Sequence, residues 1–115
     1  MKRDYIFFIK DIVEGIEWIE KFVADMNYEQ FIEDYRTVLA VIGLLEIIGE
    51  ASKNIPIHVR NKYSNIPWSD MARTRDKLIH AYFMIDYEIV WKVAKERLPS
   101  IKPYLLEILN ELKKQ

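Results

Sequence analysis

Apolar residues at helical spacing restrict the fold of this chain more than any other sequence feature. In the first segment they recur at alternating steps of four and three residues, which places them on one face of an α-helix. These residues are Tyr5, Ile9, Ile12, Ile16, Ile19 and Val23. The same pattern predicts helices over residues 4–24, 28–53, 69–80, 86–98 and 100–113. The sequence therefore predicts an all-α, up-and-down bundle of four to five helices, which we interpret as a single domain over residues 1–115.

Turn and cap residues set the expected helix ends. Asn54-Ile55-Pro56 should end the second helix, because proline disfavours helix at the residue before it. Asp86 is expected to cap the fourth helix, and Pro99 either stops that helix or starts the next one. The residues expected to face inward from the fourth helix are Ile89, Val90, Val93 and Leu98. The large side chains of Trp68, Phe83 and Trp91 are expected to anchor the core.

The middle of the second helix is apolar on every side. From Val38 to Ile48 every position except Gly43 and Glu46 is apolar. A small bundle can cover only one side of such a helix, so the other side is expected to meet a second copy of the chain. Gly43 and Gly49 each cost about 1 kcal/mol relative to alanine in a helix interior, and close approach of another backbone would explain them. We therefore predict a homodimer.

Composition narrows the class of protein. The chain has 115 residues and no cysteine, which excludes a disulfide scaffold and a thiolate metal site. Its longest apolar run is far shorter than the ~20 residues that span a membrane, and the first residues do not resemble a signal peptide. We therefore expect a cytoplasmic protein with no membrane partner. The net charge is −1, so any contact with nucleic acid has to rely on local positive charge or on a cleft shared by two subunits.

The segment from Arg75 to Tyr82 reads R-x4-H-x-Y and carries the candidate chemistry. Arginine offers a planar, permanently charged fork that suits phosphate. Histidine gains or loses a proton near neutral pH, because its unperturbed pKa is ~6.5, and tyrosine adds a hydroxyl and a ring. On a regular helix, however, Arg75 and His80 are about 7 Å and roughly 140° apart. To reach one phosphate together they need a loosened helix, a wrapped arginine or a second subunit. Asp76 lies four residues before His80, on the same face.

The motif and its flanks resemble the HEPN superfamily, and within it the HepT toxins of HepT/MntA systems. The resemblance covers nearly the whole chain and includes the motif arginine, histidine and tyrosine with the residues around them. The matching positions are Ile48-Gly49-Glu50-Ala51, Ile66-Pro67-Trp68, Arg75-Asp76, His80-Ala81-Tyr82-Phe83, Asp86 and Trp91. Asp76 departs from the pattern, because asparagine is common there in HEPN proteins.

The resemblance implies a function for each motif residue. HepT-like proteins are helical homodimers that act as metal-independent endoribonucleases and as toxins of type VII HEPN/MNT toxin–antitoxin systems. By position, His80 would be the general acid/base and Arg75 would hold the phosphate of the RNA. The antitoxin partner, an MntA-like minimal nucleotidyltransferase, would inactivate the toxin by transferring AMP to Tyr82. No resident cofactor is implied.

For several residues the sequence allows two interpretations. Glu50 is either a charge on the helix surface or a carboxylate that orients Arg75, and Asp76 is a possible support for His80. Arg73 and Lys77 are either RNA-backbone contacts or part of a solvated face. The second histidine, His58, reads as a solvated side chain, and the two histidines lack the spacing of a zinc site.

An alternative function is a non-catalytic module. In that case the dimer would bind a nucleotide or serve as a scaffold for the nucleotidyltransferase. The acidic net charge and Asp76 favour this alternative.

Overall fold

The structure is a computed structural model that describes the backbone of residues 4–80 and 84–114 and the side chains of residues 5–74 and 84–114. In the described part, the helices are joined by short turns and loops, and there is no strand. The helices are α1 (Asp4–Val23), α2 (Tyr28–Glu33), α3 (Tyr35–Lys53), α4 (Ile57–Lys62), α5 (Trp68–His80), α6 (Tyr87–Lys92), the π-helical turn η1 (Val93–Arg97) and α7 (Leu98–Lys113). The all-α prediction is confirmed.

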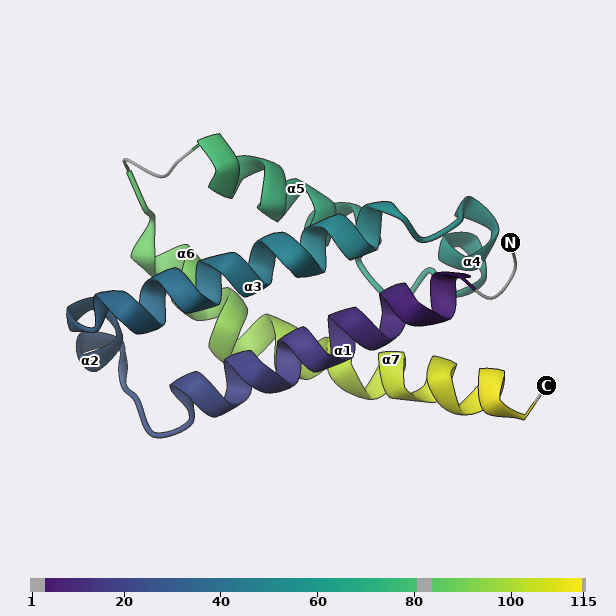
Figure 1. Ribbon diagram of the computed structural model, residues 1–115, viewed down its shortest axis with the longest axis horizontal. Helices are drawn as coiled ribbons and strands as arrows, with labels where there is room; N and C mark the ends of the chain where they lie inside the picture. The colour runs from purple at the N-terminus through teal and green to yellow at the C-terminus, as the bar shows by residue number, and fades with distance from the viewer. Residues whose placement is uncertain (1–3, 81–83, 115) are drawn as a thin grey trace.

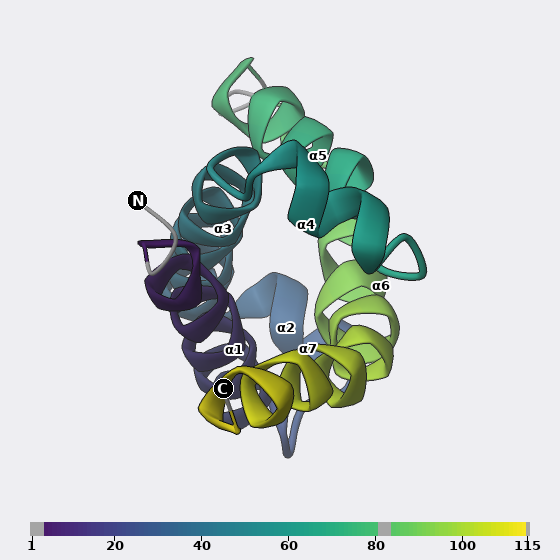
Figure 2. The ribbon, with the colours of Figure 1, turned by 90° about the vertical axis from the view of Figure 1, so that its right-hand side faces the viewer.

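Four longer helices alternate in direction to form the bundle (Figure 1). Helix α3 lies between α1 and α5 and packs against both, and α1 also packs against α7. Viewed along the long axis, α5 lies at one end of the section, beside α3 and away from α1 and the end of α7 (Figure 2).

The predicted stripe on α1 forms the centre of the core. Its five aliphatic members are buried, and Tyr5 is half-buried against them. The other helices contribute Phe31, Val38, Ile48, Trp68, Met71, Val90, Leu98, Leu105 and Ile108. Periodicity thus identified the inward face of α1 correctly, because burial of that face is what selects the 3.6-residue period.

The predicted helix over residues 28–53 is wrong in one respect: it is two helices, broken at Asp34. The Asp34 carboxylate accepts hydrogen bonds from the Thr37 backbone N–H at 3.1 Å and the Thr37 hydroxyl at 2.8 Å. These bonds to Thr37 lower the pKa of Asp34 below its usual value. An aspartate that satisfies the first N–H groups of α3 in this way competes with helix continuation, so the chain turns at this residue.

Residues 86–113 also differ from the prediction. The Asp86 carboxylate caps α6, as expected, by accepting from the Ile89 N–H. Pro99 does not interrupt the helical segment, because α6, η1 and α7 follow one another without a break. Proline lacks an N–H and its ring clashes with the carbonyl four residues earlier. Pro99 lies in the first turn of α7, where a missing N–H is tolerated. The π turn comes just before it, and the Leu98 N–H bonds to the carbonyl of Val93, five residues back. Val90 and Leu98 are buried as predicted, whereas Ile89 is 57% exposed, contrary to the prediction.

Candidate functional site

Helix α5 carries the motif, and its start is fixed by Trp68. The indole is 4% exposed, and its Nε1 donates to the carbonyl of Tyr63 at 3.1 Å. The Met71 N–H donates to the carbonyl of Pro67, so the helix begins immediately after this proline. Trp68 is therefore the core anchor that the sequence predicted, and Trp91 packs against Phe31 with ring centroids 5.1 Å apart. Phe83, the third predicted anchor, lies outside the described residues.

The structure defines the backbone positions of Arg75, Asp76 and His80. Helix α5 stays α-helical through His80, so up to that residue the helix does not loosen to bring the arginine and histidine together. Their five-residue separation keeps them roughly 140° apart around the axis. The side chains of residues 75–80, and Tyr82 altogether, lie outside the described residues. The proposed contacts of Arg75, Asp76, Lys77, His80 and Tyr82 therefore stay predictions.

The other candidate residues whose side chains the structure describes are exposed. Arg73 pairs with Asp70 on the same helix, with 2.5 Å between Nη2 and Oδ1. Glu50 lies exposed on α3, the helix that packs against α5. His58 is exposed on α4, where its ring meets that of Tyr5 edge-on, as expected for a solvated side chain. Among the described residues, no group of three His, Cys, Asp or Glu side chains is placed to hold a metal ion.

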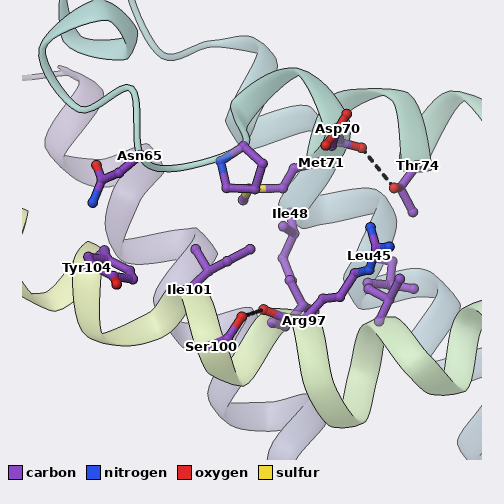
Figure 3. Close-up of a pocket in the computed structure, with 13 residues that line it drawn as sticks. Leu45, Ile48, Asn65, Asp70, Met71, Thr74, Arg97, Ser100, Ile101 and Tyr104 are labelled. Atoms are coloured by element: carbon purple, nitrogen blue, oxygen red, sulfur yellow. Dashed lines mark hydrogen bonds between the residues drawn. The ribbon is translucent and has the colours of Figure 1, made fainter.

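A groove follows α5 on the side that faces α6, η1 and α7. It consists of two adjoining cavities of about 390 and 470 Å³, and Asp70, Thr74, Val93 and Arg97 line both. The first cavity has an apolar floor of Leu45, Ile48, Met71, Leu98 and Ile101. Figure 3 shows this cavity, with the Arg97 side chain extending from the lower helix into the space beneath Thr74. The second cavity continues past Arg73 and Lys92 to Met84 and Ile89.

No sequence pattern indicates this groove. Arg97, Lys92 and Tyr104 belong to no recognisable motif. Their distance from α5 depends on the angle at which α5 packs against α3. Ile89 was predicted to face inward, and only the structure shows that it is exposed and lines the second cavity.

Residues 12–108 match the model of a protein family described as ribonuclease HepT-like. The chain belongs to this family. It is 52% identical over 102 residues to "Probable ribonuclease HepT" of Thermococcus cleftensis, covering 89% of this chain and 93% of that protein. It is 44% identical over 111 residues to a protein of Methanocaldococcus jannaschii named "Putative RNase MJ0127", covering 96% and 92% of the two chains. No solved structure gives a significant match.

Membership of the HepT-like family confirms the family that the motif suggested and the expectation of an RNA-cleaving enzyme. The exposed groove beside the motif helix is compatible with a polymeric substrate. In the described part of this HepT-like chain, no helix is both long enough and apolar enough to span a membrane.

Proposed function

We propose that this HepT-like chain is the toxin of a type VII toxin–antitoxin pair and cleaves RNA without a metal through Arg75 and His80. The family match, together with the placement of both residues on one continuous helix beside an open groove, supports this proposal. We further propose that residues 1–115 form one HEPN-like domain and that the enzyme acts in the cytoplasm.

The proposed reaction is an internal transesterification. The ribose 2′-oxygen attacks the adjacent phosphorus, a new P–O2′ bond forms, and the P–O5′ bond breaks to leave a 2′,3′-cyclic phosphate and a 5′-hydroxyl. His80 takes the 2′-hydroxyl proton and returns a proton to the departing 5′-oxygen. Arg75 neutralises the charge that develops on the non-bridging oxygens. Asp76 orients the imidazole from the same helix face, and Lys77 contacts the RNA backbone.

The site is proposed to form between two copies of the chain. An exposed apolar face on α3 supports this: Tyr35 is 57% exposed, Leu39 41% and Ile47 53%. Gly43 lies among them, and a Cβ atom there would meet nothing within 4 Å. Gly49 does not belong to this face, because it is buried within the chain itself. The contiguous apolar face is what a homodimer interface requires.

Regulation is proposed to act on Tyr82. A minimal nucleotidyltransferase would join the tyrosine oxygen to the α-phosphorus of ATP, releasing pyrophosphate and the phenolic proton. The attached AMP would bring a negative charge and a bulky group two residues from His80, which would exclude RNA from the site.

The test is to express the chain without a partner and to compare it with Arg75→Ala and His80→Ala variants. Growth arrest and RNA fragments ending in 2′,3′-cyclic phosphate should appear with the wild type and disappear with both variants. His58→Ala is the matched control, because this exposed histidine should be dispensable. Retention of cleavage by both motif variants would refute the assignment.

Co-expression with a nucleotidyltransferase tests the regulation. The intact mass should rise by one AMP in the wild type and stay unchanged in Tyr82→Phe. A wild-type protein that binds the transferase and cleaves no RNA at any concentration would instead support the non-catalytic module.

A further inference from the structure

We propose that the groove between α5 and the continuous α6–η1–α7 segment is an RNA subsite that binds one unstacked base and the phosphate beside it. This inference rests on the proposed ribonuclease function and adds a specificity-determining surface to it. The residues that carry it are Thr74, Lys92, Arg97, Ser100 and Tyr104, none of which belongs to the R-x4-H-x-Y motif.

The shape of the first cavity suits a base. Its volume of about 390 Å³ lies within the roughly 300–1,000 Å³ typical of small-molecule sites. An aliphatic floor is combined with polar residues in the lining, among them Asn65, Thr74 and Ser100. The hydroxyls of Thr74 and Ser100 donate to the carbonyls of Asp70 and Arg97, so their oxygens remain as acceptors. Tyr104 lines the cavity and is 46% exposed, so its ring is available for base stacking, which is a common way to hold single-stranded RNA.

The charge of the groove suits a phosphate. Of the cations that line its two cavities, Arg73 is paired with Asp70. Lys92 and Arg97 are exposed, and neither forms an ion pair with another described residue. The Asp86 carboxylate at the far end accepts the Ile89 N–H as a helix cap. Two available cations in one groove supply the local positive charge that RNA contact demands of a chain whose net charge is −1.

The π turn gives Arg97 its position. Val93 and Arg97 are the first and last residues of η1, and both line the two cavities. The Arg97 carbonyl accepts the Ser100 hydroxyl at 2.6 Å, which holds the backbone at the junction with α7. Single π turns inside α-helices occur frequently at functional sites, and this one places a guanidinium in the groove (Figure 3).

The groove also leads toward the motif. Arg73 lines the second cavity, and residues 77 and 80 follow it at steps of four and three, on the same face of α5. Arg73 and His80 are seven residues apart, which is about 10 Å along the axis and nearly the same direction around it. A strand with a base in the first cavity that continues along the second cavity therefore passes near the His80 position.

The experiment measures binding of fluorescently labelled single-stranded oligonucleotides that lack the 2′-hydroxyl and so cannot be cleaved. Fluorescence anisotropy across a salt series is compared for wild type, Arg97→Gln, Tyr104→Ala and Ser100→Trp, with Lys113→Gln as an exposed control far from the groove. Loss of one phosphate contact at Arg97 should reduce the slope of log K against log salt by about 0.7. Loss of stacking at Tyr104 should weaken binding roughly tenfold, and Trp at position 100 should fill the cavity.

Cleavage of oligoribonucleotides that differ in one base completes the test. A base preference at one position near the cut should be lost in Ser100→Trp and Tyr104→Ala, and the motif residues remain intact in both variants. Wild-type cleavage with unchanged binding and preference in all groove variants would overturn the subsite and leave the ribonuclease function standing. Binding that depends on the groove residues, without any cleavage by the wild type, would support the subsite and refute the ribonuclease function. Absence of binding by the wild type, or a change only in self-association in Ser100→Trp, would also overturn the subsite.

Discussion

Gly15 on α1 lies directly against Ile48 on α3. A Cβ atom placed on Gly15 would lie 2.9 Å from Ile48 Cγ1 and 3.2 Å from its Cδ1. Ile48 is 2% exposed, and its Cγ1 is not the free end of the side chain. The absence of a side chain at residue 15 thus allows the two central helices to approach closely. This close approach fixes the position of α3 against α1, and α3 in turn packs against the motif helix α5.

Substitution Gly15→Ala is therefore expected to destabilise the protein. Overpacking costs about 1–3 kcal/mol, and the gain in helix propensity returns about 1 kcal/mol, so the free energy of unfolding should fall by about 1 kcal/mol. Gly43→Ala is the matched control, because the chain leaves open space there. Urea unfolding of both variants at low protein concentration measures the difference. A Gly15→Ala protein as stable as the wild type would show that Ile48 moves aside freely.

Charge on the exposed face of α3 is expected to break the dimer. Ile47→Glu places a carboxylate at a position that is 53% exposed in the single chain and that we assign to the interface. Self-association should weaken at least tenfold, since a buried unpaired charge is costly. Ile57→Glu changes an isoleucine that is 68% exposed on α4 and should have no effect. Sedimentation equilibrium measures the self-association of both variants. Equal association of Ile47→Glu and Ile57→Glu would show that this face of α3 is not the interface.

The phenol of Tyr63, the residue that follows α4, forms a pH-dependent contact with α7. Its hydroxyl donates to Glu111 Oε2 at 2.6 Å, and this hydrogen bond, with some burial, raises the Tyr63 pKa to about 12. A raised tyrosine pKa stabilises the fold fully below the ordinary value near 10, and the contribution is lost as the pH rises from 10 through 12. Tyrosinate absorbance should show a phenol that titrates near pH 12, that is absent in Tyr63→Phe and that is shifted toward 10 in Glu111→Gln. Tyr63→Phe should cost about 1 kcal/mol at pH 7; an unchanged titration curve in Glu111→Gln would contradict this pairing.

Regular apolar patterns predicted the helices of this chain well, whereas helix ends that depend on a few side-chain contacts were not predictable. The α1 stripe was predictable because burial imposes one period on all its members. The break at Asp34 was not, because aspartate both occurs within helices and caps them, and only the contacts with Thr37 decide between the two. Pro99 was assigned to a boundary because proline usually ends a helix, whereas here it lies in the first turn of α7, which directly follows η1.

One part of the candidate site, the motif, was predictable from the sequence, and the other part, the groove, was not. The motif is contiguous in sequence, so residues 75–82 could be recognised from their order alone. The groove is lined by α5 and by residues more than twenty positions further along the chain, such as Arg97 and Tyr104. Its existence depends on the angle between helices, which no local pattern encodes.

The regularity of α5 leads to the sharpest prediction about the proposed catalytic site. Arg75 and His80 lie roughly 140° apart on a helix that is continuous through residue 80. We therefore expect each site to combine Arg75 of one protomer with His80 of the other. Mixing inactive Arg75→Ala and His80→Ala proteins should restore about a quarter of wild-type activity, because half the dimers are mixed and each mixed dimer carries one intact site of two.

The reciprocal mixture provides the control. Wild type paired with the Arg75→Ala/His80→Ala double variant contains no intact site if the two residues come from different protomers, and one intact site if both come from the same protomer. Tagged heterodimers purified from each mixture should therefore show activity only in the first. Activity only in the second would place both residues in one protomer, in which case the arginine would have to wrap around α5 to reach the phosphate.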